Sequence, residues 1–525
     1  MARLSGIGVR RVRTLFDLGV PIALSPVTVL LGRNSVGKST FARLLPLLRQ
    51  SAERKKRGPI LWFDDLVDFG TLSQTVTRGS SDLEFVLKLD DIGDQANRNR
   101  STAWGEYQSP NLLKIDGAIV TMTMAGEAGS GATYAKQLRI DVAGTHVTLC
   151  FSQNLLESLT IGSQSFSWST ERQRIYVEQG AILPRLVFTE LRKAGENAWF
   201  LARNPWRGVV SDYLHRYVHQ NTSKGTMTGI AGRLPVAAPP VVARVVQSID
   251  GPPSWLAARP YFADSKSSQC SRLVENLLAA NIDVLLDRLD DALSNAAKGV
   301  RYLKPLRATA ERYYRRADLA VSEIDPEGRN LAVFLDALSP YQLQSFRAWL
   351  KSNFDLDVEP RREGAQVVLL AKGPNDSGAS NVADMGFGLS QVLPIAAQLW
   401  ASSTPYMART GTSKTSYIVI EQPELHLHPA FQAKLADVFA GVVRPKSDAS
   451  TKFDGMGIVV ETHSQHLVNR LGLLIEQGRL VADDVSIVLF EADESNPGTS
   501  KARVCKFDSE GVLEDWPFGF FEPDY

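Results

Sequence analysis

The chain contains little cysteine, and its charges nearly cancel. Three cysteines, Cys150, Cys270 and Cys505, occur among 525 residues, and none forms a C-x-x-C pair. An odd number of widely separated cysteines argues against structural zinc and a disulfide framework, and favours reduced thiols. The 58 basic and 57 acidic residues give a net charge of +1, so no overall field draws the protein to nucleic acid.

Long apolar runs and sustained heptads are also missing. No stretch approaches the roughly 20 residues that span a bilayer, and the first residues carry no signal-peptide core. The lack of repeated heptads argues against a long coiled coil. We therefore expect a cytoplasmic protein without a membrane partner. DNA remains a possible partner through the basic runs 54–57 and 312–316, although most such runs are solvated faces.

What the sequence does contain is a complete phosphate-binding loop of the pattern G-x-x-x-x-G-K-[ST]. An apolar run at 27–31 predicts a buried strand before it, and apolar residues at helical spacing from Phe41 predict a helix after it. Strand, glycine loop and helix form the context in which backbone N–H groups bind a polyphosphate. We therefore expect a bound nucleotide, ATP, at Gly32, Arg33, Asn34, Ser35, Val36, Gly37, Lys38, Ser39 and Thr40.

A second motif predicts a magnesium ligand. The apolar run 417–420 reads as a strand that ends at Glu421, and Q-P-E-L-H-L-H-P follows it. A carboxylate at a strand end beside a phosphate loop holds Mg²⁺ and its waters. We therefore expect Ser39 and Glu421 to be the metal ligands, and Lys38 to reach the β- and γ-phosphates.

Two further motifs lie near the same carboxylate in sequence. The segment 384–391 contains G-x-G-x-S-Q before an apolar helix, and it reads as either a second anion-binding helix terminus or a plain turn. The strand predicted at 458–460 leads into E-T-H-S-Q-H. His463 then follows a strand end, where a polar side chain can face the γ-phosphate, although a lone histidine is more often structural.

The order of these motifs resembles that of ABC-class ATPases. The segments IVIEQPELHLHP, GFGLSQVLPI and VVETHSQHL are similar to those of OLD-like, SMC-like prokaryotic "AAA-domain" ATPases. The segments 302–307 (YLKPLR) and 511–521 (GVLEDWPFGFF) resemble one subfamily that carries a C-terminal domain of unknown function. The resemblance covers roughly residues 1–80 and 300–525, and the middle of the chain matches only loosely.

The resemblance implies that two heads close face to face, with each ATP held between one phosphate loop and the partner's signature turn. The chain would then form a homodimer or a higher oligomer of dimers. The signature residues that would contact the partner's nucleotide are Gly386, Gly388, Ser390 and Gln391. The catalytic residues it implies are Glu421, Gln422, Glu424 and His463.

One position departs from the usual ABC pattern. Gln422 stands where a glutamate normally orients or deprotonates the attacking water. Glutamine can orient water but cannot accept a proton. Because general-base assistance contributes roughly 10²–10⁴-fold, we expect slow ATP hydrolysis, and Glu424 or His463 could supply the missing role.

The expected fold is α/β: an ABC-type P-loop ATPase head, made of a mixed sheet with helices plus an antiparallel β-layer, with an inserted mainly helical lobe. Alternating runs such as 83–89 and 118–124 predict the β-layer, and the clearest helix covers 273–293, with an apolar stripe that is more often core than interface. Segment 63–74 is either a metal-sensing loop or a surface turn. The expected divisions are 1–80 (N-terminal head), 81–190 (β-layer), 191–300 (helical lobe), 301–480 (C-terminal head) and 481–525 (strand-rich tail).

Three functions remain open at this point. The resemblance implies a molecular switch for a separate effector, a nuclease or toxin, in prokaryotic anti-phage defence. OLD nucleases add a Toprim domain, but after His463 this chain offers only local acids at 491–494, so we expect no nuclease activity of its own. The alternatives are a RecF- or Rad50-like ATPase of DNA repair or chromosome structure, and a non-hydrolysing ATP-dependent scaffold.

Overall fold

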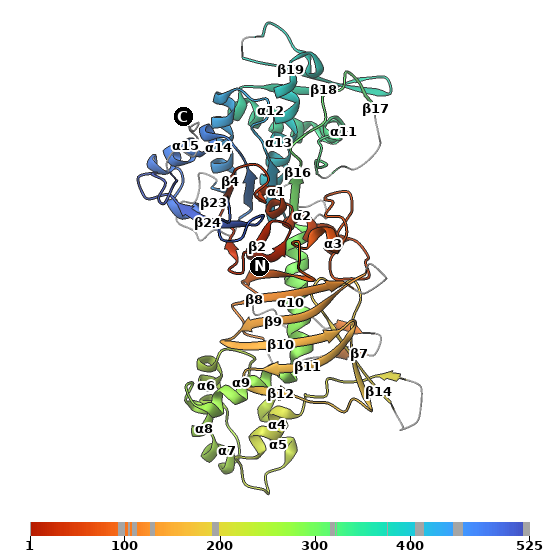
Figure 1. Cartoon of the computed structure of the whole chain (residues 1–525), viewed down its shortest axis with the longest axis vertical. Coiled ribbons are helices and arrows are strands. Elements are labelled where there is room, and N and C mark those ends of the chain that lie inside the picture. Colours follow the sequence, from red (N-terminus) through yellow and green to blue (C-terminus); the bar gives the residue numbers. More distant parts are fainter. Residues whose placement is uncertain are drawn as a thin grey trace.

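A computed structural model of the chain describes residues 2–92, 100–102, 105–107, 113–126, 132–191, 199–315, 321, 323–374, 376–404, 414–444 and 455–517. The molecule is elongated, with a head that contains the parallel strands at one end and a group of helices at the other (Figure 1). Antiparallel strands lie between these two ends, and one long helix runs alongside them toward the head.

The head is built on five parallel strands. Their order is β16 (Val300–Leu303), β21 (Tyr417–Glu421), β22 (Gly457–Glu461), β4 (Val27–Gly32) and β23 (Val485–Ala492). Every residue of the first four is buried. Strands covered on both faces read as continuous apolar runs, which is why the sequence predicts three of them well.

Antiparallel pairing extends this sheet into the β-layer. β23 pairs with β24 (Ser500–Lys506), and β1 (Arg3–Val12) pairs with β5 (Asp82–Asp90). The layer continues through β8 (Gly117–Gly126), β9 (Thr133–Val142), β10 (Thr145–Ser152) and β11 (Leu155–Ile161). Shorter strands complete this 18-stranded sheet: β2 (Leu15–Asp17), β3 (Ile22–Ala23), β12 (Gln164–Phe166), β13 (Gln173–Val177), β14 (Leu186–Leu191) and β15 (Trp199–Leu201).

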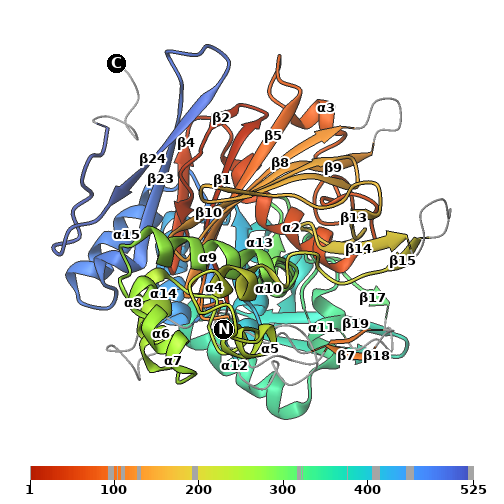
Figure 2. The ribbon, with the colours of Figure 1, turned by 90° about the horizontal axis from the view of Figure 1, so that it is seen from below.

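The helical end of the molecule, seen from below in Figure 2, comprises α4 to α9, and α10 runs from it along the antiparallel strands to the head (Figure 1). The sequence predicts one helix over 273–293, but the structure has two, α9 (Ser268–Ala280) and α10 (Ile282–Lys298). The chain leaves helical geometry at Asn281, and the side-chain Nδ2 of this residue donates to the Leu277 carbonyl at 2.8 Å. The leucines of the predicted apolar stripe are each 0% exposed and therefore belong to the core: Leu277, Leu278, Leu285, Leu289 and Leu293. The other helices here are α4 (Val209–His215), α5 (Lys224–Ala231), α6 (Pro239–Ser248), α7 (Pro253–Ala258) and α8 (Pro260–Ala263).

Helices also cover the parallel strands of the head. α13 (Phe387–Ser403) is buried all round from residue 390 to 401, whereas α14 (Pro429–Val443) and α15 (Gln465–Glu476) bury one side each against this core. The remaining helices are α3 (Leu72–Thr75), α11 (Leu331–Ala337), α12 (Pro340–Phe354), η1 (Val382–Asp384) and η3 (Ala482–Asp484). A separate four-stranded sheet contains β17 (Tyr314–Arg315), β18 (Asp357–Glu363), β19 (Gln366–Lys372) and β20 (Ser380–Asn381). A two-stranded sheet contains β6 (Arg100–Thr102) and β7 (Gly105–Tyr107).

The helix after the phosphate loop is interrupted. The sequence predicts one helix, but the structure has α1 (Lys38–Ala42) and α2 (Leu44–Glu53), with Arg43 between them. Proline lacks an N–H, so Pro46 cannot donate to the carbonyl of Ala42 four residues earlier. The predicted α/β class, with a mixed sheet, an antiparallel layer and a mainly helical insertion, is confirmed.

Candidate nucleotide-binding site

The phosphate loop connects the end of β4 to the start of α1. Gly32 has φ 146°, and a Cβ there would lie 2.4 Å from the carbonyl oxygen of Phe490. Gly37 has φ 97° and caps α1. Only glycine adopts such backbone geometry without strain, so both glycines of the motif are required by the turn itself.

Lys38 is folded back over this loop. Its Nζ donates to the carbonyl oxygens of Gly32 and Arg33, at 2.9 and 2.7 Å, and the residue is 4% exposed. Burial lowers the pKa of the ammonium. The side chain is therefore held at the loop by two neutral acceptors, which phosphate oxygens can replace with a stronger charge-assisted contact.

Ser39 contacts a carboxylate that the sequence analysis did not select. Its Oγ donates to Oε1 of Glu461 at 2.8 Å. Glu461 ends β22, and its Oε2 is buried without a hydrogen-bond partner among the described residues. Burial and the neighbouring Glu421 carboxylate raise the pKa of Glu461 to about 7.

Glu421 ends the neighbouring strand β21, as predicted, but it lies within a different set of contacts. Nε and Nη2 of Arg43 donate to its two carboxylate oxygens, each at 2.8 Å, and the Tyr302 hydroxyl donates to Oε1 at 2.6 Å. Glu421 is 1% exposed. Its predicted role as a metal ligand stays a prediction, because both oxygens are bonded within the chain and the Ser39 hydroxyl bonds Glu461.

The other predicted catalytic residues lie just beyond these strand ends. Gln422 has φ 45°, and its N–H donates to the carbonyl of Glu461 at 2.7 Å. Oε1 of Glu424 accepts from the backbone N–H of His463 at 2.7 Å, which connects the two motifs. Burial raises the pKa of Glu424. Desolvation is the larger cause and the Lys38 charge the smaller cause that lower the pKa of His463, whose side chain is exposed in part.

The signature turn is divided between surface and interior. Gly386 and Phe387 are exposed, with Gly386 at φ 86°. Ser390 and Gln391 are 5% and 0% exposed, and they bond the backbone of the segment 307–310 in their own chain. The turn therefore exposes Gly386, whereas Gly388 is half-buried beside the His426 carbonyl and the serine and glutamine fix the turn to the segment 307–310.

Arg307 was noticed in the sequence only as part of a resembling segment, but it lies beside Glu421. Its Nη2 donates to the Glu421 carbonyl at 2.9 Å, while Nε and Nη1 are buried without a hydrogen-bond partner in the described part of the chain. Burial lowers its pKa to about 10. Arg43, Tyr302, Arg307 and Glu461 are the site residues that sequence reasoning missed. Only Glu461 had a usable signal, because it ends an apolar strand as Glu421 does.

The residues around Ser39 fit a magnesium ion. The Ser39 hydroxyl and the unpartnered Oε2 of Glu461 are the oxygen donors that Mg²⁺ prefers, together with substrate phosphates and waters. The described residues contain no group of three or more histidine, cysteine or acidic side chains arranged as a closed metal cage. A Mg²⁺ ion here would therefore depend on the nucleotide for much of its coordination.

The other candidate features from the sequence lie in surface contacts. Gln74 caps α3 by accepting from the Thr71 N–H at 2.8 Å, which fits the surface-turn interpretation of 63–74. In the first basic run, Arg54 pairs with Asp64 at 2.9 Å. In the second, Arg312 pairs with Asp384 at 2.6 Å, and residue 316 lies outside the described residues.

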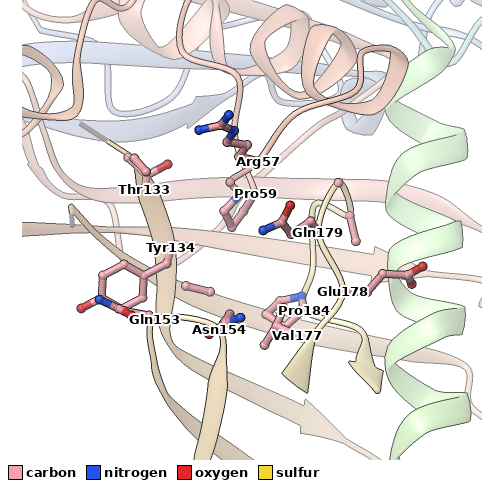
Figure 3. A pocket seen from close by; sticks show the side chains of 15 residues that line it. Arg57, Pro59, Thr133, Tyr134, Gln153, Asn154, Val177, Glu178, Gln179 and Pro184 are labelled. Carbon is pink, nitrogen blue, oxygen red and sulfur yellow. The ribbon is translucent and has the colours of Figure 1, made fainter. Parts of the chain in front are cut away.

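A separate cavity of about 440 Å³ lies on the β-layer (Figure 3). Arg57, Tyr134 and Gln153 are among its lining residues, and no residue of the phosphate loop or the strand-end motifs lines it. Among the described residues, no helix is both long and apolar enough to cross a membrane.

The chain was compared with known proteins. The AAA ATPase domain family matches residues 270–468. The matched part contains the signature turn, both strand-end glutamates and His463, but not the phosphate loop. This part of the chain is thus similar to an ATPase domain. A comparison with curated proteins finds no match.

Solved structures that resemble the chain include heads of SMC proteins. The Smc head domain of Pyrococcus furiosus, solved with an extended coiled coil and bound to the C-terminal domain of ScpA, is 10% identical, with a TM-score of 0.35 over 96% of this chain and 97% of that one. The SMC head domain of Thermotoga maritima is 8% identical, with a TM-score of 0.33 over 95% and 98%. The Smc head of Pyrococcus yayanosii is 10% identical, with a TM-score of 0.35 over 97% and 98%.

Proposed function

We propose that the protein binds ATP with Mg²⁺ and hydrolyses it slowly. The observation that carries this proposal is the phosphate loop at the end of β4, with Lys38 held over it and two carboxylates, Glu421 and Glu461, at the ends of the next strands. When bound, Mg²⁺ would neutralise charge on the phosphates. Lys38 binds the phosphate oxygens, and Ser39 orients toward the metal.

Slow hydrolysis follows from the chemistry of the second strand-end position. Gln422 can hold a water molecule but cannot take its proton. Glu424 is our candidate for that role, since its Oε2 is buried and unpartnered in the described residues, and its pKa is raised by burial. A carboxylate in that state accepts a proton more readily than an exposed one.

We further propose that two copies close around ATP. The exposed Gly386 of the signature turn supports this, because a Cβ there would meet nothing within 4 Å and the backbone is open to a partner. Three apolar side chains are also exposed around the turn, Leu306 at 68%, Tyr313 at 49% and Phe387 at 42%. A contiguous apolar patch is typical of a contact surface, whereas single exposed apolar side chains are common on any protein. The switch role, a separate effector and anti-phage defence rest on the sequence resemblance alone.

The proposal is tested by measuring phosphate release and the oligomeric state with ATP and Mg²⁺. We expect slow release in the wild type and none in Lys38→Ala, and an ATP-dependent rise in mass by light scattering. Fast turnover that is insensitive to Glu421→Gln would contradict the assignment of the strand-end carboxylate. Dimerisation by ATP without any phosphate release would instead identify the non-hydrolysing scaffold.

A further inference from the structure

Glu461 is a buried carboxylate next to the phosphate loop, and it lacks a cationic partner. Its Oε1 accepts from Ser39, and Oε2 has no hydrogen-bond partner among the described residues. The residue is 2% exposed, and no ion pair to it occurs in the described part of the chain. A buried carboxylate oxygen in this state raises the free energy of the fold unless a cation or a proton satisfies it.

Glu421 has the opposite surroundings. Arg43 occupies both of its oxygens, and Tyr302 adds a third hydrogen bond. Glu421 must therefore give up a nearly buried ion pair before it can ligate a metal, which is expensive when the partner charge stays behind. Oε2 of Glu461 has no such contact to give up.

We propose that Glu461, together with Ser39, forms the protein side of the Mg²⁺ site, and that Glu421 is a positioning residue held by Arg43 and Tyr302. This inference rests on the proposed function, because the metal ion enters with ATP. It assigns the metal to the strand adjacent to the phosphate loop, β22, rather than to β21, one strand further away.

The position of Glu461 supports this assignment. β22 pairs directly with β4, and Glu461 is in register with Leu30, two residues before the loop begins at Gly32. Neighbouring strands lie about 4.8 Å apart. The hydrogen bond to Ser39 therefore connects a P-loop hydroxyl, the usual Mg²⁺ ligand of such loops, directly to this carboxylate.

Mn²⁺ is the probe for the test, because its binding can be followed by electron paramagnetic resonance without any turnover. Glu461→Gln keeps the size of the side chain and an oxygen that can accept from Ser39, but it removes the charge. We expect the affinity of the protein–ATP complex for Mn²⁺ to fall at least about 10-fold, since even indirect ligand partners change metal affinity about 10–100-fold. ATP binding in EDTA should not weaken. The matched variant Glu421→Gln should lower Mn²⁺ affinity clearly less than Glu461→Gln does, because Glu421 does not contact the metal in this assignment.

The outcomes separate the inference from the proposed function. Retention of Mn²⁺ by Glu461→Gln, or its loss in Glu421→Gln alone, overturns the inference while ATP binding in EDTA stays intact. The proposed function itself is overturned if the wild type binds no ATP, either in EDTA or with Mn²⁺. The wild type would then behave like Lys38→Ala. Should Glu461→Gln fail to fold by circular dichroism, Ser39→Ala tests the same site, and unchanged Mn²⁺ affinity in that variant also overturns the inference.

Discussion

Glu421 and Glu461 are register partners at the ends of the parallel strands β21 and β22, and in the described part of the chain only Glu421 forms an ion pair. Two carboxylates this close repel each other, and the pKa of Glu461 is raised partly by this repulsion. Arg43 neutralises one of the two charges. The geometry leaves the other carboxylate, next to Ser39, for a cation that is not part of the chain.

Replacing Arg43 by methionine should destabilise the head strongly. Arg43→Met leaves Glu421, whose side chain is 2% exposed, without its counter-charge. Breaking a fully buried pair costs about 3–5 kcal/mol. Because the Arg43 side chain is 31% exposed, we expect about 2–4 kcal/mol in urea unfolding.

The double variant Arg43→Met/Glu421→Gln is the control for this prediction. It removes both charges, so it should recover a large part of the lost stability, whereas Tyr302→Phe should lose one hydrogen bond to a carboxylate, about 1.5–3 kcal/mol. A double variant no more stable than Arg43→Met would mean that the ion pair is not what Arg43 contributes.

Loss of the P-loop lysine should weaken nucleotide binding without unfolding the chain. Among the described residues Lys38 donates to the carbonyls of Gly32 and Arg33, so Lys38→Ala removes two hydrogen bonds and a buried ammonium whose pKa burial already lowers. We expect ATP affinity to fall at least about tenfold, since a charge-assisted phosphate contact is lost. Calorimetry with ATP and thermal unfolding without it test the two parts separately.

A substitution at the first glycine of the loop should be harmful for geometric reasons. Gly32→Ala places a Cβ 2.4 Å from the Phe490 carbonyl oxygen, at a φ of 146°. Strained backbone of this kind costs about 1–3 kcal/mol, and the steric contact adds to it. Gly441→Ala is the matched control, because a Cβ there meets nothing within 4 Å. It lies in α14 and should be neutral or stabilising by roughly 0.5 kcal/mol. Equal melting temperatures for both variants would contradict this account.

The parallel core could be predicted from the sequence because its strands are buried on both faces. The apolar runs at 27–31, 417–420 and 458–460 correspond to β4, β21 and β22. The carboxylates at two strand ends follow from the same rule. The same rule selects Glu461 as well as Glu421, because each ends a buried apolar strand.

The contacts of the site could not be predicted in the same way. Arg43 and Glu421 are 378 positions apart in the chain, and their ion pair depends on which strands become neighbours. Arg43 also lies at the break between α1 and α2. Pro46 is consistent with this break, but its position in the sequence does not predict where the break occurs. Likewise, the apolar spacing at 273–293 continues through Asn281, so periodicity alone does not reveal where α9 ends.

The stability of the protein should depend on pH through Lys56. Burial lowers the pKa of this ammonium to about 8, and its Nζ donates to the Gly180 carbonyl at 2.7 Å. In the unfolded chain the pKa is about 10.4. Between these two values the unfolded state binds more protons than the folded state, so the free energy of unfolding rises as pH increases from about 8 to 10. Below pH 8 both states are protonated, and the penalty of burying the charge is fully present.

Lys56→Met removes this titration, and the exposed neighbour supplies the control variant Lys55→Met. In urea unfolding, wild type and Lys55→Met should gain stability relative to Lys56→Met as the pH rises from 8 to 10. From pH 6 to 7.5 the difference between the variants should stay constant. A difference that is flat across the whole range would show that the Lys56 ammonium is solvated in the folded protein, and a change in the opposite direction would show that the fold stabilises its charge; either result contradicts the prediction.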